Sequence, residues 1–274
     1  MKITKILNNN AVIVLQDGRE KIAIGSGIAF QKKRNDIIIA SKIEKIFVMQ
    51  ENDKLVQLLS RIPEEHFTIS EEIITYAEAY LNTRLNEHIH IALTDHISFA
   101  IERAKDGIKL NNRLLHEIRV LYRAEFEIGL WAIQHINNTC KVEMPVDEAA
   151  YIALHIHTMK IQGGDLHQTI RQTNIIKSMV LSIKAYLNIE IEENDISYHR
   201  LITHLRFALT RLNQSELHMM DEEMLVMIQK KFPVGYSCAS QVAKELRAAH
   251  AIEFPEEELG YIALHIERLR KQVS

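Results

Sequence analysis

The hexapeptide Tyr-Ile-Ala-Leu-His-Ile occurs twice in this chain, as residues 151–156 and as residues 261–266, 110 positions later. A second group of residues recurs with an offset of 108: Thr94, His96, Phe99, Ala100 and Arg103 correspond to Ile202, His204, Phe207, Ala208 and Arg211. A spacing that is kept across so many positions is typical of an internal repeat. The sequence therefore predicts a duplicated module of about a hundred residues, with a pair of histidines in each copy.

Amphipathic helices are expected along most of the chain after residue 50. Apolar residues recur there at intervals of three and four, which is the spacing of one helix face. We expect helices over residues 55–62, 69–85, 90–104, 114–122, 125–137 and 147–159, and again over residues 173–187, 197–213, 221–232, 237–249 and 256–271. Pro63 followed by two glutamates indicates a linker, and Gly163-Gly164-Asp165 separates the two sets. Each module is thus predicted to be a bundle of about five helices.

The first fifty residues have the alternating pattern of short strands. Residues 3–7, 11–15 and 20–24 are β-rich runs separated by Asn8-Asn9-Asn10 and by a turn at Asp17-Gly18, and the apolar runs 28–30 and 37–39 complete a meander. A sheet of this size has little core, so we expect two copies to pack face to face in a homodimer. The predicted fold class is mostly α: a small N-terminal antiparallel β-sheet domain followed by two homologous helical bundles.

The charge is unevenly distributed between these parts. Residues 1–50 contain nine Lys or Arg against four Asp or Glu, although the whole chain has a net charge of −3, so the remainder is acidic. Basic side chains attract phosphate, Asn amides can contact base edges, and an exposed Phe can stack on a base. The sheet is therefore a candidate RNA-binding surface. The alternative is a solvated basic face above a phenylalanine of the core.

The composition excludes several classes of protein. With 47% hydrophobic residues, 25% charged residues and four Pro, the chain is globular rather than disordered. Its two cysteines, Cys140 and Cys238, are too few for a disulfide framework, and free thiols in the cytoplasm are expected. The apolar runs are too short to span a bilayer and the N-terminus has no signal-like core, so we expect no membrane insertion.

The repeated histidines lie on defined helix faces. In each module one histidine shares a face with a glutamate and a tyrosine: Glu148, Tyr151 and His155; Glu258, Tyr261 and His265. The other histidine shares a face with a phenylalanine and an arginine: His96, Phe99 and Arg103; His204, Phe207 and Arg211. A single histidine on a helix is most often structural. Four at equivalent places in two repeats indicate a common chemistry.

Three chemistries use such histidine pairs. A metal would need closely spaced ligands on one face, but the pairs at 88/90 and 155/157 are two residues apart and point in different directions. Acid–base catalysis would need a substrate loop or nucleophile, and the sequence contains no Gly-rich phosphate loop, nucleophile elbow or paired catalytic carboxylates. We therefore expect no enzyme activity, no cofactor and no metal. A neutral imidazole can accept a phosphoryl group, so reversible histidine phosphorylation fits duplicated non-catalytic modules best.

Three segments of the strand-like N-terminal part, called the head below, resemble the co-antiterminator RNA-binding domain of the BglG/LicT/SacY family of transcriptional antiterminators. They are Met-Lys-Ile-Thr-Lys-Ile-Leu-Asn-Asn-Asn, Gly-Ser-Gly-Ile-Ala-Phe-Gln-Lys-Lys and Ile-Glu-Lys. In that family the domain dimerises and clamps a hairpin in nascent messenger RNA, which prevents a terminator from forming. The resemblance covers residues 1–55 and implies RNA contacts from Lys5, Asn10, Gly25, Ser26, Phe30, Gln31 and Lys32. Many members have Gly-Arg-Gly where this chain has Gly25-Ser26-Gly27, so one possible phosphate or base contact is lost.

The helical part resembles the paired phosphotransferase-system regulation domains of the same family. Its motifs are Leu-Thr-Asp-His, Asp-Glu-Ala-Ala-Tyr-Ile-Ala-Leu-His, Tyr-His-Arg-Leu-Ile-Thr-His-Leu and Glu-Glu-Leu-Gly-Tyr-Ile-Ala-Leu-His-Ile-Glu-Arg. The resemblance implies regulation domains at residues 66–168 and 169–274, with phosphorylation at His96, His155, His204 and His265. The chain departs from the family at residues 111–114 and 122–123, where members commonly show Asn-Pro-Leu and Tyr-Pro, and this departure predicts looser loop geometry.

The resemblance also implies how the modules act. The sugar-specific permease of the phosphotransferase system would phosphorylate the first module and inactivate the protein when no sugar arrives. The histidine-containing phosphocarrier protein would phosphorylate the second and stabilise the active dimer. The regulated operon would serve sugar use, with a β-glucoside favoured. We expect Asp95, Arg103 and Arg211 beside the phosphorylated histidines, with the arginines receiving the phosphoryl charge.

The alternative to an RNA-binding antiterminator is a DNA-binding activator with the same regulation domains. Such a protein would need a helix-turn-helix head in place of the strand-like first fifty residues.

Overall fold

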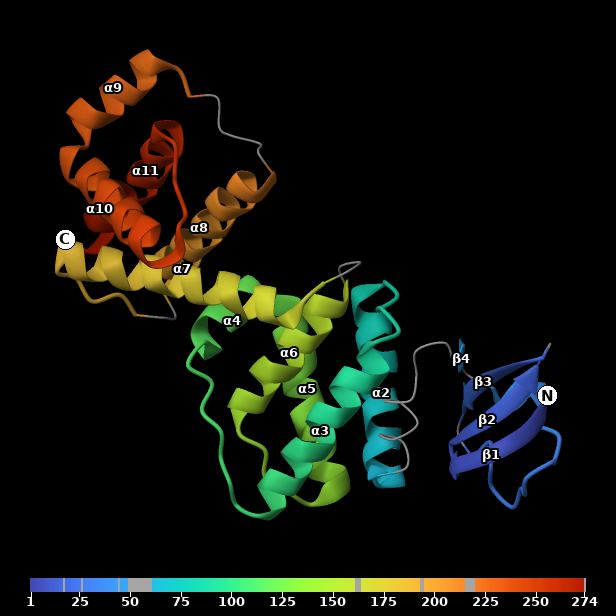
Figure 1. Cartoon of the computed structure of the whole chain (residues 1–274). Coiled ribbons are helices and arrows are strands. Elements are labelled where there is room, and N and C mark those ends of the chain that lie inside the picture. Colours follow the sequence, from blue (N-terminus) through green and yellow to red (C-terminus); the bar gives the residue numbers. More distant parts are fainter. Residues whose placement is uncertain are drawn as a thin grey trace. The chain divides into compact units, whose positions relative to one another are not determined.

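The computed structural model describes residues 1–16, 18–25, 27–43, 45–48, 61–160, 164–192, 195–214 and 220–273. Within these ranges the chain is mostly helical, with a small N-terminal sheet (Figure 1), which confirms the predicted fold class. The chain divides into two compact units, residues 1–111 with 124–164 and residues 112–123 with 165–274. Ser26 and the expected helix over residues 55–62, apart from its last two positions, lie outside the described residues.

The N-terminal sheet is antiparallel and has the strand order β1-β2-β3-β4. Its strands are β1 (Lys2–Asn8), β2 (Ala11–Gln16), β3 (Arg19–Ile24) and β4 (Lys45–Val48). The first three are those predicted, whereas the fourth is not the expected 37–39 run. That run makes only an isolated bridge between Ile37 and Lys2, because β4 pairs with the outer edge of β3. Residues 28–30 form turns rather than a strand, with the amide of Phe30 donating to the carbonyl of Gly27.

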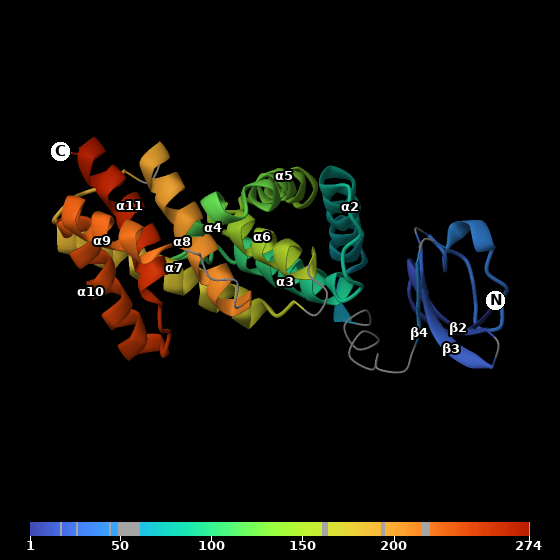
Figure 2. The ribbon, with the colours of Figure 1, turned by 90° about the horizontal axis from the view of Figure 1, so that it is seen from above.

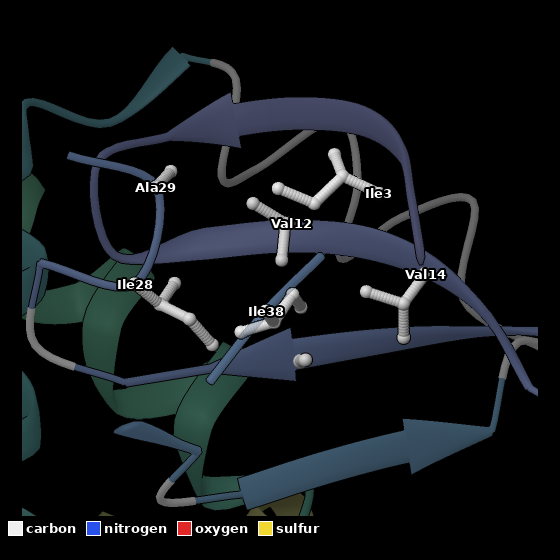
Figure 3. Close-up of a cluster of buried hydrophobic side chains, with 7 residues drawn as sticks. Ile3, Val12, Val14, Ile28, Ala29 and Ile38 are labelled. Atoms are coloured by element: carbon white, nitrogen blue, oxygen red, sulfur yellow. The ribbon is translucent and has the colours of Figure 1, made fainter. Parts of the chain in front are cut away.

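The sheet is buried on both faces because apolar residues occupy consecutive positions of β2. Val12 and Val14 pack on one face with Ile3 and with Ile28 and Ile38 from the segment after β3, as Figure 3 shows. The alternate positions belong to a second buried cluster that includes Phe67 of α2 (Glu64–Leu81), together with Ala11, Ile13, Ile22 and Ile24. Since successive strand residues point to opposite faces, this continuous apolar run fills two cores.

Four long helices of the first unit form a bundle: α2, α3 (Ile89–Lys105), α5 (Arg123–Cys140) and α6 (Val146–Lys160). Figure 1 and Figure 2 show them side by side. Helices α5 and α6 approach closely at Gly129, where a Cβ would lie 2.2 Å from the backbone oxygen of Ala149. The absence of a side chain at this position therefore permits the crossing.

The second unit contains α7 (Leu166–Leu187), α8 (Ile196–Gln214), α9 (Glu222–Lys231), α10 (Pro233–His250) and α11 (Glu256–Val273). Aspartates cap two of these helices: Asp165 accepts from the amide of His167, and Asp221 accepts from the amide of Met224. Each cap satisfies a backbone donor that the first turn of a helix leaves free.

The short helix α4 (Leu115–Leu121) lies between α3 and α5 in the sequence but belongs to the second unit. Buried Glu117 accepts a hydrogen bond of 3.2 Å from the hydroxyl of Tyr198 on α8. The guanidinium of Arg206, also on α8, donates to the carbonyl of Leu121 at 3.0 Å. Figure 2 shows α4 beside α7 and α8. The predicted boundary between residues 168 and 169 stays a prediction.

Both cysteines are free thiols; Cys140 is half-buried and Cys238 is buried. Burial, with a smaller contribution from Glu245, raises the pKa of the Cys238 thiol to about 12, so this thiol is protonated at neutral pH. Among the described helices, none has the length and apolar character needed to cross a membrane.

Candidate functional site

The first histidine pocket lies between α3 and α6. Glu148 on α6 is buried and has two partners from α3. Its Oε1 accepts a hydrogen bond from Nη2 of Arg103 at 2.8 Å, and its Oε2 lies 3.1 Å from Nε2 of His96. The His96–Glu148 contact has the distance of an ion pair but departs from ideal hydrogen-bond alignment. One carboxylate is thus shared between an imidazole and a guanidinium.

The second histidine of this pocket comes from the same helix as the carboxylate. His155 lies nearly two turns after Glu148 on α6, and its ring centroid is 5.0 Å from that of His96. Tyr151 stands between these positions, with its ring 5.7 Å from that of His96. Because residues three or four apart share a helix face, the Glu-x₂-Tyr-x₃-His spacing directs all three side chains towards α3.

The equivalent pocket in the second unit, between α8 and α11, has a different pattern of contacts. Arg211 donates from Nε and Nη2 to the two oxygens of Glu258, each at 2.7 Å, so the pair is bidentate. Nδ1 of His204 lies 2.8 Å from the hydroxyl of Tyr261. The rings of His204 and His265 are stacked, with centroids 3.5 Å apart and planes at 18°. The equivalent residues therefore meet in both units, but with different partners.

Burial lowers the pKa of three histidines in the two pockets. We call His155 and His265 the inner histidines. Burial, followed by the charge of His96, lowers the pKa of His155 to about 3. Burial, followed by the charge of His204, lowers the pKa of His265 to about 4. The pKa of His204 is also below its ordinary value, because of burial and then the charge of Arg268. At neutral pH these imidazoles are neutral, which is the form that can act as a nucleophile.

The carboxylate of the first pocket stays ionised at neutral pH. Burial alone would raise the pKa of Glu148, but hydrogen bonds from His96 and Arg103 and their charges outweigh burial, and its pKa lies below the ordinary value. In the second pocket the hydrogen bonds that Arg211 donates to Glu258 raise the pKa of Arg211 despite partial desolvation. Each pocket therefore combines neutral imidazole with a charged Arg–Glu pair.

The structure brings together the four predicted histidines in two pairs and places Arg103 and Arg211 beside them. Asp95 is half-buried on α3, and within the described chain no hydrogen bond or ion pair joins it to either histidine. The sequence placed the glutamates and tyrosines on the histidine faces without assigning them a partner. The signal that could have identified Glu148 and Glu258 is the repeated Glu-x₂-Tyr-x₃-His spacing itself.

The candidate RNA-binding residues fall into two groups in the N-terminal domain. The first is organised by Asn10, whose side-chain oxygen accepts from the amide of Gly27 at 2.7 Å and whose amide group donates to the hydroxyl of Thr68 at 2.9 Å. The amide of Gly25 donates to the backbone oxygen of Asn10. Asn10 is consequently buried and links the β1–β2 turn to the segment after β3.

Other predicted RNA contacts are exposed. Phe30 is 61% exposed, and Gln31, which follows it, has a left-handed backbone with a φ of 58°. Lys32 is half-buried. Lys5 on β1 is exposed and lines a shallow hollow together with Arg34, which the sequence did not single out. The signal for Arg34 was the basic run Lys32-Lys33-Arg34. Phe30 and the basic residues remain open to a ligand.

A small basic sheet and two copies of one histidine-bearing module define a regulator with a nucleic-acid-binding head and duplicated control modules. Comparison with known families agrees with this class. Residues 1–55 match the CAT RNA binding domain, and residues 71–159 and 177–269 each match the PRD domain.

Individual relatives match along the whole chain. The chain is 36% identical over 277 residues to transcription antiterminator LicT of Bacillus subtilis (strain 168), covering 99% of this chain and 100% of the relative. It is 35% identical over 279 residues to the beta-glucoside operon antiterminator of Dickeya chrysanthemi, covering 100% and 98%. The crystal structure of GlcT CAT-PRDI is similar with a TM-score of 0.54 and 37% identity, over 58% of this chain and 97% of that chain. This chain belongs to the family of antiterminators with a CAT RNA-binding domain and two PRD domains.

Proposed function

We propose that this protein is a cytoplasmic bacterial antiterminator that acts as a homodimer on a hairpin in nascent messenger RNA. Binding would prevent a terminator from forming upstream of a sugar-utilisation operon, for which the similarity to a beta-glucoside operon antiterminator favours a β-glucoside. The observation that carries the proposal is the presence, in one chain, of a CAT RNA-binding head and two PRD modules.

The chemistry of the head supports RNA rather than duplex DNA as the ligand. Phe30 offers an exposed ring for stacking on an unpaired base, while Lys5 and Arg34 supply phosphate attraction from one hollow. A DNA-binding activator would require a recognition helix. Within the described part of residues 1–48, the one helical segment is a single 3-10 turn at Ala40–Lys42. RNA binding by loops and strands is therefore the better-supported function.

The histidine pockets support control by phosphorylation. Neutral His155 and His265 can each attack a phosphorus atom. We assign the sugar-specific permease as the phosphoryl donor for the first module and the histidine-containing phosphocarrier protein as the donor for the second. No catalytic role is assigned to the pockets, and the protein is proposed to be a regulator rather than an enzyme.

A phosphoryl group would change the contacts inside each pocket. It carries close to two negative charges and accepts hydrogen bonds strongly, so it competes with the carboxylate for the neighbouring guanidinium. In the first pocket it would draw Arg103 from Glu148, and in the second it would draw Arg211 from Glu258. Since each arginine and glutamate join different helices, this exchange alters how the two helices are held together.

RNA binding of the full chain tests the head. Titration with an antiterminator hairpin, a scrambled hairpin and a DNA duplex over a salt series should show selective RNA binding with moderate salt dependence. Phe30→Ala should weaken binding at all salt concentrations, because stacking is not ionic. Lys5→Ala should mainly reduce the salt slope. Equal binding to all three ligands would contradict the proposal.

Phosphorylation by the two donors tests the control modules. With purified donor proteins and a phosphate source, the permease should modify His96 or His155, and the phosphocarrier should modify His204 or His265. Variants with both histidines of one module replaced by Ala should lose modification by one donor and keep it by the other. Modification by either donor that survives replacement of all four histidines would overturn the assignment.

A further inference from the structure

The two pockets engage opposite nitrogens of equivalent histidines. In the first, Nε2 of His96 lies 3.1 Å from the carboxylate of Glu148. In the second, Nδ1 of His204 lies 2.8 Å from the hydroxyl of Tyr261. The two nitrogens of an imidazole give chemically distinct phosphohistidines, so this difference has consequences for the modification. The inference that follows rests on the proposed phosphorylation of these histidines.

Glu148 determines where His96 carries its proton. An ionised carboxylate can only accept hydrogen bonds, so the nitrogen that faces it must carry the hydrogen. The contacts that Glu148 receives from His96 and Arg103 favour its ionised form. Neutral His96 therefore holds its proton on Nε2 and has its lone pair on Nδ1.

The corresponding carboxylate in the second pocket is directed elsewhere. Both oxygens of Glu258 accept from Arg211 at 2.7 Å. His204 meets a hydroxyl group instead, whose oxygen can accept the Nδ1–H of the ring, and this tautomer leaves the lone pair on Nε2. That hydroxyl occupies the Nδ1 side of the ring, and a phosphorus atom can approach without displacing Tyr261 only at Nε2.

We propose that the two modules form different phosphohistidine isomers, with His96 phosphorylated on Nδ1 and His204 on Nε2. Glu148 is the residue that positions the first ring for this outcome, and Tyr261 is its counterpart in the second. Identical histidine motifs in one chain thus give two distinguishable modifications.

The transfer step balances without a further reactant. The lone pair on Nδ1 of His96 attacks the phosphorus of the phosphorylated donor side chain, and the bond between that phosphorus and the donor atom breaks, with the bonding pair returning to the donor atom. The donor side chain thereby returns to its unphosphorylated form. The accepting ring changes from neutral imidazole to phosphorylated imidazolium and keeps its proton on Nε2, opposite Glu148. The carboxylate then faces a positively charged ring and stabilises the product.

The tautomer of the unmodified histidine gives the first test. Long-range ¹H–¹⁵N correlation spectra of the ¹⁵N-histidine-labelled full chain distinguish a protonated from an unprotonated ring nitrogen, and His96→Gln identifies the resonances. We expect Nε2–H at His96. A proton found on Nδ1 would overturn the proposal. Because this measurement uses no phosphate, it separates a failure of the inference from a failure of the proposed phosphorylation.

Glu148→Gln gives the second test. Arg103 can only donate, so it will hold the amide oxygen of the new side chain and leave the NH₂ group facing His96. That group donates to Nε2 and moves the proton to Nδ1. We expect the ratio of the two tautomers to change by about tenfold or more towards Nδ1–H, because the charged acceptor that faces Nε2 is replaced by a donor. An unchanged ratio in a folded variant would contradict the role of Glu148.

Isomer-specific detection of phosphohistidine completes the test. Full chains that retain only His96 or only His204 of the four histidines are phosphorylated by their donors and probed with antibodies that distinguish the Nδ1 and Nε2 isomers. We expect one isomer from each chain, and Glu148→Gln should convert the first towards the second. Glu258→Gln is the matched control, since that carboxylate contacts Arg211, and the isomer at His204 should not change. The same isomer from both chains would overturn the proposal.

Discussion

The two histidine pockets contain the same residues at nearly the same spacing, yet they differ in what their glutamate binds. Glu148 divides its oxygens between Arg103 and His96. Glu258 gives both oxygens to Arg211, and the histidines of that pocket stack at 3.5 Å instead of 5.0 Å. The spacing that is repeated in the two modules therefore defines which side chains meet. The orientation of the arginine side chain decides which of them share hydrogen bonds and ion pairs with the glutamate.

Because of this difference, the stability of the second pocket depends more strongly on its arginine than the stability of the first pocket does. A bidentate pair between Arg211 and a fully buried carboxylate has strict geometry, whereas the shared carboxylate of the first pocket keeps one partner when the other is lost. Substitutions at equivalent positions should consequently have unequal effects in the two units.

The largest expected difference concerns the arginines. Arg211→Ala should lower the free energy of unfolding of the second unit by about 3–5 kcal/mol, because buried Glu258 loses two charged hydrogen bonds. Arg103→Ala should cost the first unit less, since His96 stays beside Glu148. Urea unfolding followed by circular dichroism gives both values. Equal losses would mean that the two carboxylates are equally dependent on arginine.

A second difference lies in two helix crossings, α5 with α6 in the first unit and α10 with α11 in the second. Gly129→Ala should destabilise the first unit by about 1–3 kcal/mol, because the new methyl group would lie 2.2 Å from the backbone oxygen of Ala149. Gly235→Ala should cost less, since the nearest atom, the oxygen of Ala263, is 2.8 Å away. Thermal unfolding of both variants checks the order. A stabilised Gly129→Ala protein would show that α5 and α6 can separate freely.

Acidification should weaken both units through their inner histidines. His155 and His265 have a folded pKa of about 3 and about 4, below the ordinary value of 6.5, so between these limits the unfolded chain binds protons that the folded chain does not. Stability is therefore lost as pH falls from 6.5, by at most about 1.4 kcal/mol per pH unit for each histidine.

The pH effect can be assigned to individual units. Unfolding is measured at pH 6.5 and 5.5 for the original protein and for His155→Gln and His265→Gln, each of which should remove part of the slope. Glu125, whose pKa lies at about 2, stays ionised in this interval and adds nothing to the slope. A slope that is unchanged in both variants would assign the pH dependence to other groups.

The smallest expected difference concerns the tyrosines. Tyr261→Phe removes the hydroxyl that lies 2.8 Å from Nδ1 of His204 and should cost about 1 kcal/mol. Tyr151→Phe should cost less, because the ring contact with His96 does not depend on the hydroxyl. Differential scanning calorimetry can resolve the two variants. A larger loss for Tyr151→Phe would reverse the comparison.

The sequence predicted the helices well because their cores depend on a simple period. Helix α8 was expected over residues 197–213 and occupies Ile196–Gln214, and α11 was expected over residues 256–271 and occupies Glu256–Val273. The pairing of histidines was predictable for a related reason, since each pair is fixed by two amphipathic helices whose apolar faces must meet. Family resemblance supplied the class of protein, which the comparisons confirm.

Features that depend on long-range competition were not predictable. Strand β4 replaces the 37–39 run because two segments compete for one sheet edge, and local β-propensity does not decide between them. The division of Glu148 between two partners and the bidentate binding of Glu258 depend on helix separations that no periodicity encodes. The exact RNA contacts, phosphorylated histidines and domain boundaries remain predictions.

The membership of α4 in the second unit has a consequence for the order of events during protein synthesis. Glu117 leaves the ribosome 81 residues before its partner Tyr198. At a synthesis rate of about 5–20 residues per second, roughly 4–16 s pass between the synthesis of Glu117 on α4 and that of Tyr198 on α8. During that interval the helices of the first bundle can already assemble around an unpaired insertion. The nascent chain thus exposes the buried face of α4 transiently, and completion of the second unit is what removes this aggregation-prone surface.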